Sequence, residues 1–349
     1  YMSMVGMGCV FDCLTEVAAD GSLKGELAES WEASPDAKVW TFKLRKGVTF
    51  HNGKDFGADD MIATIEDHIR EESKSAAKSI LQPIQEMKKL DNHTVQVTLK
   101  SGSADFPYLL SDYHILVFPA GMKDEAFTKG IGTGAYMLES FDPGVITTAK
   151  KNPNDYRTDR GHFDSVEVIA MNDATSRMNA LSTGAVHAIS RADKKTLGLL
   201  KRNPKMEVHD ITGNQHYTFP MLQKIAPFDN NDVRLALKYG INRQEMVDKI
   251  LQGHGAVGND HPIGPANQYL AKPEDIGGQR EYDADKAKFH LKKAGLDSIK
   301  VDISAADAAF AGAVDAAVLY QASAAKAGIE INVVREASDG YWSNVWNKK

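Results

Sequence analysis

The strongest constraint on the fold is a succession of strand, helix and strand patterns late in the chain. Residues 299–304 (IKVDIS) and 330–336 (EINVVRE) are short runs rich in valine and isoleucine, as strands are. Between them lies an alanine-rich helical segment that ends at Gly328. Because strands joined through a helix pair in parallel, this segment predicts a βαβ unit.

A second pattern, near the amino terminus, predicts antiparallel strands beside a helix. Large apolar and polar side chains alternate in residues 39–45, and residues 94–100 (TVQVTLK) show the same period. The dipeptide Asn52-Gly53 marks a tight turn. After the turn, residues 58–69 carry acidic side chains in the first helical turn and then an apolar stripe. The chain therefore mixes α and β structure.

The length of the chain bears on its domain organisation. A chain of 349 residues predicts two or three domains, because single cores rarely grow that large. Residues 213–228 contain two prolines and interrupt the periodic patterns, and a long helix is predicted after them, over residues 233–251. A linker or hinge is expected over residues 213–228.

Charge and composition exclude several classes of protein. The 47 acidic and 41 basic residues give a net charge of -6 without a long basic run, so nucleic-acid binding is not expected. No apolar run approaches the roughly 20 residues that a membrane-spanning helix needs. Cys9 and Cys13 are too few for a disulfide framework, and two buried thiols are the favoured interpretation over a bridge.

No cofactor or metal motif has its proper context. A G-x-G-x-x-G pattern at residues 253–258 follows a predicted helix instead of a strand, so we interpret it as a loop. The histidine pairs His209/His216 and His254/His261 lack the short spacing of zinc ligands, and no cofactor is expected. G-x-S-x-G, Walker and S-x-x-K motifs are absent. An enzyme that uses His216 and His261 with nearby carboxylates remains an alternative, because acids and bases often come from distant loops.

Aromatic side chains are a weaker indication of a binding site than a motif would be. His216, Tyr217 and Phe219 lie in the predicted hinge, and Tyr341, Trp342 and Trp346 lie near the end of the chain. Core packing is one interpretation of these residues. The other is that they face a cleft between domains, where small-molecule sites are often lined by aromatic rings.

One long stretch resembles a known family. The segment LAESWEASPDAKVWTFKLRKGVTFHNGKDFGADDMIATIE (27–66) is similar to the signature region of the family 5 extracellular solute-binding proteins, the peptide, nickel and opine receptors of bacterial ABC importers. Further pieces occur in the family's order, including GTGAYML and APFDNNDVRLALKYGINRQEMV, and the resemblance spans nearly the whole chain.

The resemblance implies an α/β, two-lobed periplasmic-binding-protein fold of type II, with an extra subdomain inserted in lobe I. Residues 1–17 and 120–215 are then expected to form the core of lobe I, residues 18–119 the inserted subdomain, and residues 216–349 lobe II. It further implies that the chain is incomplete at both ends. It would lack the first strand of lobe I and the C-terminal return to that lobe.

The resemblance also implies a function. A protein of this family is expected to work as a monomer in the periplasm, to capture a small molecule or peptide in the cleft, and to deliver it to an inner-membrane ABC permease without chemical change. A peptide, a peptide-like molecule or a cationic metabolite is the expected ligand. A ligand-binding role for a chemoreceptor would use the same fold.

Candidate ligand-binding residues follow from position in the family. Met4 and Met7 and the loop Gly132–Thr133–Gly134 match positions that line the pocket in relatives, as do the hinge residues His216, Tyr217 and Phe219. Methionine at positions 4 and 7 favours a ligand with varied side chains over a metal chelate, because the flexible methionine side chain adapts to different neighbours. Asp260 and His261 are further candidates: Asp260 would form a salt bridge with a ligand amine, or else cap a turn. Trp342 is the last of the candidate ligand-binding residues.

Overall fold

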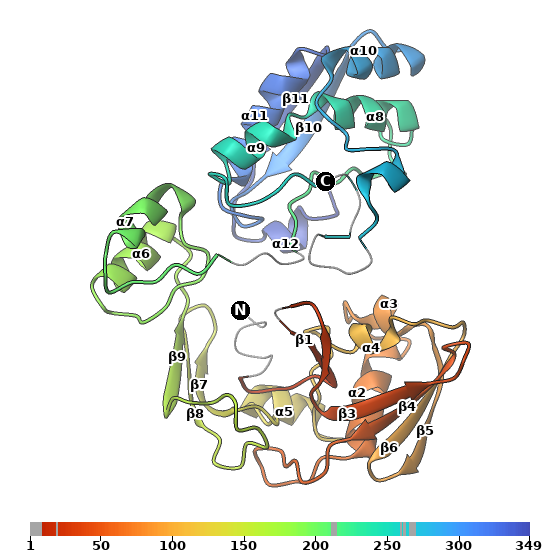
Figure 1. The fold of residues 1–349 in the computed structure, drawn as a ribbon, viewed down its shortest axis with the longest axis vertical. Helices are drawn as coiled ribbons and strands as arrows, with labels where there is room; N and C mark the ends of the chain where they lie inside the picture. Colours follow the sequence, from red (N-terminus) through yellow and green to blue (C-terminus); the bar gives the residue numbers. More distant parts are fainter. Residues whose placement is uncertain (1–8, 19, 211–214, 259, 261–262, 265–269) are drawn as a thin grey trace. The chain divides into compact units, whose positions relative to one another are not determined.

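The computed structural model describes residues 9–18, 20–210, 215–258, 260, 263–264 and 270–349. The chain forms two compact units, Tyr1–Asn172 and Asp173–Lys349 (Figure 1). The family resemblance places the start of lobe II at residue 216, within the second unit, and this division stays a prediction. No helix among the described residues is long and apolar enough to cross a membrane.

A four-stranded antiparallel sheet forms the largest part of the first unit (Figure 1). Its strands are, in spatial order, β3 (Ala28–Ala33), β4 (Val39–Leu44), β6 (Thr94–Leu99) and β5 (Ile84–Asp91). The alternation in β4 buries its large side chains against helix α2 (Ala58–Ile69), which packs on one face of the sheet. The predicted strands and helix of this region are thus confirmed.

The remainder of the first unit is a hairpin, a small sheet and short helices. The three-stranded antiparallel sheet has the order β7 (Tyr136–Asp142), β8 (Ile146–Lys151) and β9 (Ser165–Ile169). The other elements are β1 (Thr15–Val17), β2 (Leu23–Gly25), α3 (Lys78–Leu81), α4 (Phe106–Leu109) and α5 (Lys123–Lys129).

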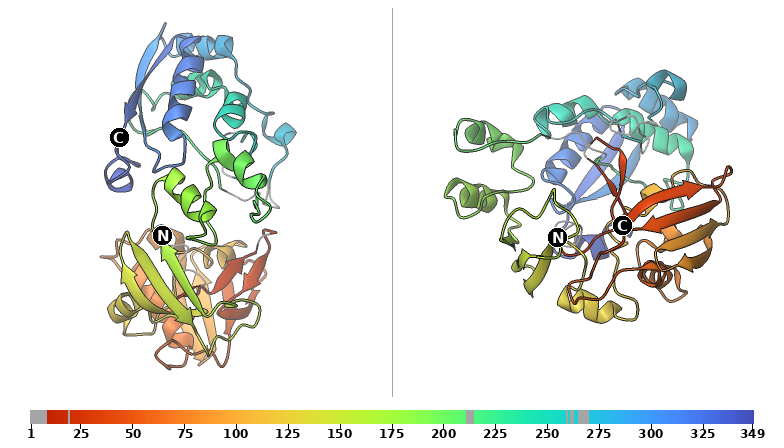
Figure 2. Two further views of the ribbon diagram at one scale, coloured as in Figure 1. Left: turned by 90° about the vertical axis from the view of Figure 1, so that its left-hand side faces the viewer. Right: turned by 60° about the horizontal axis from the view of Figure 1, so that its bottom comes forward.

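The second unit contains the predicted βαβ motif. Strands β10 (Ile299–Ala305) and β11 (Ile329–Arg335) pair in parallel, with Ile299 opposite Ile329. Helix α11 (Ala313–Ala325) joins them and packs against the sheet (Figures 1 and 2). The other elements are α6 (Ala174–Ser182), η1 (Lys194–Thr196), α7 (Leu197–Lys201), α8 (Asn231–Gly240), α9 (Arg243–Lys249), η2 (Pro273–Ile276), α10 (Ala284–Lys293) and α12 (Tyr341–Asn344).

The single helix predicted over residues 233–251 was wrong, because the structure has two helices, α8 and α9. Ile241 is extended (φ -93°, ψ 127°), which ends the first helix after Gly240. Asn242 then caps the second helix, its side chain accepting a hydrogen bond from the backbone N–H of Glu245 at 3.1 Å. At the end of α8 the chain packs closely on α11, where a Cβ on Gly240 would lie 3.7 Å from the Cα of Ala324.

Candidate functional site

The loop Gly132–Thr133–Gly134 is packed directly against the extended segment around Val10. The backbone N–H of Gly134 donates to the carbonyl of Val10 at 3.0 Å. A Cβ on Gly132 would lie 1.9 Å from that same carbonyl oxygen, so no side chain fits at this position. Close backbone approach therefore accounts for both glycines of the loop.

His51, in the turn after β4, fixes both ends of this loop. Its Nδ1 lies 3.1 Å from the carbonyl oxygen of Gly130, and its Nε2 lies 2.9 Å from that of Gly134. Its backbone N–H donates to the carbonyl of Gly132 at 2.8 Å. The segment after β4 that contains His51 thus positions a candidate ligand-binding loop.

Beneath the loop lies a buried network of charged side chains. The hydroxyl of Thr133 donates to Asp12 at 2.8 Å, and the other carboxylate oxygen of Asp12 accepts from Arg157 at 2.8 Å. The same guanidinium nitrogen of Arg157 lies 3.3 Å from Glu26. Burial and the neighbouring Asp12 carboxylate raise the pKa of Glu26 to about 9. One arginine thus neutralises Asp12, while Glu26 is stabilised in its protonated form.

This network was missed in the sequence because its members are far apart in the chain. Asp12 and Arg157 are separated by 145 positions, and neither lies in a local motif. The side chains of Asp12 and Arg157 are 0% and 8% exposed, so they hold the loop from behind and do not face solvent. Their role is to position Thr133.

In the second unit, three exposed aromatic rings and one that is half-buried form two contacting pairs. We call Tyr217, Phe310, Trp342 and Trp346 the aromatic surface. The rings of Tyr217 and Phe310 stack with centroids 4.1 Å apart and planes 18° from parallel. The two tryptophan rings meet edge to face, with centroids 5.8 Å apart. Sequence reasoning named Tyr217 and Trp342 as candidates but missed Phe310, which lies in an alanine-rich loop without a motif.

Phe219 has a different environment from its neighbour Tyr217. Its ring packs edge to face on Tyr320, with centroids 5.3 Å apart, and contacts the main hydrophobic core of the second unit. The structure therefore gives Phe219 a packing role. His216 is exposed and makes an interaction within the protein.

Asp260 already has two cationic partners in its own unit. One carboxylate oxygen accepts from Arg243 at 2.7 Å and the other accepts from Arg280 at 2.7 Å. Although burial alone would raise the pKa of Asp260, the two arginines lower it below its ordinary value. Its charge is balanced without a ligand, and contact with a ligand amine stays a prediction. Met4, Met7 and His261 lie outside the described residues.

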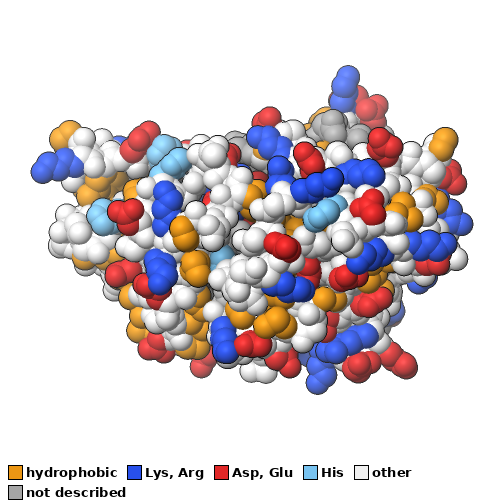
Figure 3. Space-filling view, turned by 90° about the horizontal axis from the view of Figure 1, so that it is seen from below, with side chains coloured by type: hydrophobic (Ala, Val, Ile, Leu, Met, Phe, Trp, Pro, Cys, Tyr) orange, Lys and Arg blue, Asp and Glu red, His pale blue; other side chains and the backbone are white. Residues whose placement is uncertain are grey.

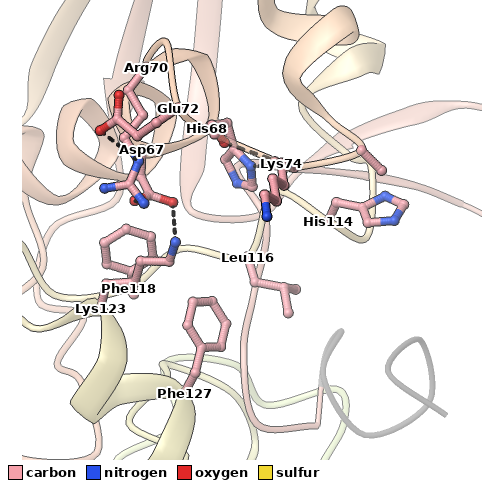
Figure 4. A pocket seen from close by; sticks show the side chains of 13 residues that line it. Asp67, His68, Arg70, Glu72, Lys74, His114, Leu116, Phe118, Lys123 and Phe127 are labelled. Atoms are coloured by element: carbon pink, nitrogen blue, oxygen red, sulfur yellow. Dashed lines mark hydrogen bonds and ion pairs between the residues drawn. The ribbon is translucent and has the colours of Figure 1, made fainter.

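A cavity of about 450 Å³ opens in the first unit, and sequence reasoning did not identify it. Figure 4 shows the apolar side chains of Leu116, Phe118 and Phe127 on one side of it. Asp67 lies on its rim and binds Lys123 there (Figure 4). The residues that line it come from three separate segments, so no local pattern could have indicated the cavity.

The described residues show no metal site and no basic nucleic-acid face in the view drawn. No group of three or more histidine, cysteine or carboxylate residues in the described parts of the chain is placed to hold a metal ion. Acidic and basic side chains are interspersed over the face drawn in Figure 3. This face has no basic stripe of the kind that binds a phosphate backbone.

Comparison with known proteins identifies the family. Residues 22–349 match the family described as "Bacterial extracellular solute-binding proteins, family 5 Middle". This chain belongs to the family 5 extracellular solute-binding proteins. Members of the family are the ligand-binding components of ABC importers, and they act in the periplasm or outside the cell. The family is one of binding proteins and not of enzymes.

Two curated relatives of this family 5 protein illustrate its range of ligands. Di/tripeptide-binding protein 1 of Pseudomonas aeruginosa (strain UCBPP-PA14) is 29% identical over 317 residues, which are 82% of this chain and 58% of that protein. Heme-binding protein A of Haemophilus influenzae is 28% identical over 298 residues, 77% of this chain and 53% of that protein. This chain thus spans about half the length of these relatives.

Solved structures confirm the two-lobed α/β fold. NikZ from Campylobacter jejuni, determined in complex with Ni(L-His), superimposes with a TM-score of 0.80 at 24% identity. The match covers 96% of this chain and 70% of that one. At this level of identity the similarity concerns the fold alone.

Proposed function

We propose that this protein is an extracytoplasmic receptor that captures a small solute between its two lobes and delivers it to the permease of an ABC importer. The observation that carries the proposal is the family match over residues 22–349. Export to the periplasm and action as a monomer are parts of the same proposal. Capture by such a receptor leaves the solute chemically unchanged.

The proposed ligand is a peptide or a peptide-like molecule. Among the described residues, the backbone N–H groups of Gly132 and Thr133 donate no hydrogen bond. Buried N–H groups rarely stay unpaired, so they favour a ligand carbonyl or carboxylate as their acceptor. A peptide offers both groups. Among the relatives, one is named for di- and tripeptides and another for haem, so the family alone does not decide the ligand.

The proposed mechanism is closure of the lobes about a hinge. A ligand that contacts both lobes binds the closed form more tightly than the open form, and so shifts the population toward closure. The permease then recognises the closed form. The buried network under Thr133 keeps the loop in place before the ligand arrives, which lowers the entropy lost on binding.

The proposal is tested by capturing the ligand. The complete gene product would be purified from its host, weighed by native mass spectrometry, and denatured to release and identify its solute. We expect one small solute per protein, released unchanged. If the preparation is solute-free, thermal-shift assays with tripeptides, haem and nickel–histidine would search for it.

Two outcomes would argue against the importer function. Conversion of the solute during incubation with the purified protein would indicate an enzyme. If deletion of the gene left uptake of the captured solute unchanged but abolished chemotaxis toward it, the protein would serve a chemoreceptor.

A further inference from the structure

The aromatic surface lies at the edge of the sheet where ligands bind in α/β proteins. Strands β10 and β11 are parallel, and the chain leaves both at the same edge. Phe310 follows β10 along the chain, whereas Trp342 and Trp346 follow β11. In open α/β sheets, ligands bind outside the carboxyl ends of the strands.

Three of these rings are more exposed than core aromatic residues. Tyr217, Trp342 and Trp346 are 41%, 56% and 42% exposed. Large apolar side chains that gather on a surface mark binding sites, whereas single exposed ones carry no meaning. The four rings form two contacting pairs, so none of them stands alone.

A single loop connects the two pairs of rings. Ala306 is buried with Tyr341 and Val345, and the following alanines pack against the same cluster. Phe310, at the end of this loop, stacks on Tyr217. The two pairs are thus held by one continuous piece of chain.

The loop and helix beneath the rings are well anchored. Tyr341 and Val345 are 6% and 7% exposed, which fixes α12 and with it the two tryptophans. Tyr217 lies two residues before Phe219, which packs into the main core of the unit. Rings held in this way lose little conformational freedom when a ligand binds.

Two carboxylates in the segments that follow β10 and β11 already have partners inside the protein. Asp307 accepts a hydrogen bond from the backbone N–H of Gly312 at 3.2 Å. Glu336 accepts from the hydroxyl of Ser304 at 2.9 Å and from Lys349 at 3.0 Å. Both carboxylates have partners within the protein, so neither is left to pair with a ligand amine.

We propose that the captured solute carries an aromatic ring, or a comparable flat apolar group, that packs on Tyr217 and Trp342. The inference rests on the proposed receptor function and narrows its ligand class. Aromatic pairs prefer stacked or edge-to-face geometries, and both kinds are already present among the four rings. For a peptide ligand, the proposal predicts a preference for phenylalanine, tyrosine or tryptophan side chains.

Two peptides that differ in one side chain test the inference. Binding of Ala-Phe-Ala and Ala-Ala-Ala to the complete gene product would be measured by isothermal titration calorimetry. We expect Ala-Phe-Ala to bind at least about tenfold more tightly, since a buried ring adds both apolar area and ring contacts. Trp342→Ala and Tyr217→Ala should each reduce this ratio severalfold, and Trp342→Phe should keep most of it.

A matched control is Phe289→Ala, on α10 of the same unit. Phe289 is 61% exposed but lies outside the aromatic surface, so its removal should leave the ratio unchanged. Circular dichroism of each variant would confirm that it folds.

The possible failures are distinguishable. Equal binding of the two peptides, or a ratio unaffected by Trp342→Ala and Tyr217→Ala, would overturn the inference and leave the receptor function standing. Failure of both peptides to bind would overturn the peptide ligand, and the inference would fall with it if Trp342→Ala and Tyr217→Ala left binding of the captured solute unchanged. Whether the protein is a receptor at all is decided separately, by the captured solute.

Discussion

At the scale of single residues, the clearest prediction concerns Gly132. Gly132→Ala should destabilise the first unit by about 2–4 kcal/mol, because the added Cβ would lie 1.9 Å from the carbonyl oxygen of Val10. Gly198→Ala is the matched control. An added Cβ there meets nothing within 4 Å and sits in α7, so it should change stability by less than about 1 kcal/mol. Urea unfolding measures both, and equal effects would contradict the packing argument.

The raised pKa of Glu26 should make the free energy of unfolding of the first unit depend on pH. Its pKa is about 9 in the folded protein, against an ordinary value of 4.5, so the folded state holds the proton more tightly. Its contribution to stability is fully present below pH 4.5 and is lost as the pH rises toward 9, by at most about 1.4 kcal/mol per pH unit. Glu26→Gln, which mimics the neutral side chain, should flatten the pH dependence of the free energy of unfolding between about pH 5 and 8.

The control for Glu26 is an exposed carboxylate nearby. Glu29→Gln, on the solvent side of β3, should keep the wild-type slope of unfolding free energy against pH. If Glu26→Gln also kept that slope, then Glu26 would be ionised in the folded protein.

At the scale of elements, the start of α2 depends on Asp60. Its carboxylate accepts from the backbone N–H of Gly57 at 2.9 Å and of Ala120 at 2.7 Å, and it also binds Lys54. Asp60→Ala should destabilise the first unit by about 2–4 kcal/mol, because it leaves buried donors unpaired. The amide of Ala120 should also exchange hydrogen faster.

Asp59 provides the matched control for that prediction. It lies beside Asp60 in the same turn, but its side chain is 67% exposed and pairs only with Lys89 in the described structure. Surface pairs contribute little, so Asp59→Ala should cost less than about 1 kcal/mol. Equal losses in the two variants would show that helix-dipole effects, and not buried hydrogen bonds, explain the role of Asp60.

Elements were predictable from the sequence wherever their signal was local. The alternation in β4, the apolar stripe of α2 and the βαβ unit are properties of neighbouring residues, and the structure confirms all three. The break between α8 and α9 was not predicted, because the apolar period continues across it. A cap formed by one side chain, that of Asn242, outweighed the periodic pattern.

The candidate site was less predictable than the elements. The glycines at 132 and 134 were found only through family resemblance. The backbone around Val10, which leaves no room for a side chain at either position, is distant in sequence. Arg157 and Phe310 were not found, because their partners come together only in the folded chain. Local patterns predict which side chains are buried but not which distant ones meet.

At the scale of the whole molecule, the two units have separate cores of different kinds. The core of the first unit is rich in fully buried aromatic rings, among them Phe42, Phe50 and Phe106. The core of the second unit contains mainly alanine and aliphatic side chains, such as Ala324 and Ile329. Larger buried side chains remove more apolar area from water, so the first unit should be the more stable.

This difference predicts two unfolding transitions in the solute-free protein. In rising urea, pulsed hydrogen exchange with mass spectrometry should find β10 and β11 unprotected at a lower concentration than β4 and β6. A solute that contacts both lobes binds only when both are folded, so it should raise the first midpoint and bring the two together. Trp342→Ala should weaken that coupling without shifting the transition of β4 and β6. Coincident transitions without solute would contradict the prediction, because they would mean that the two cores fold as one cooperative unit.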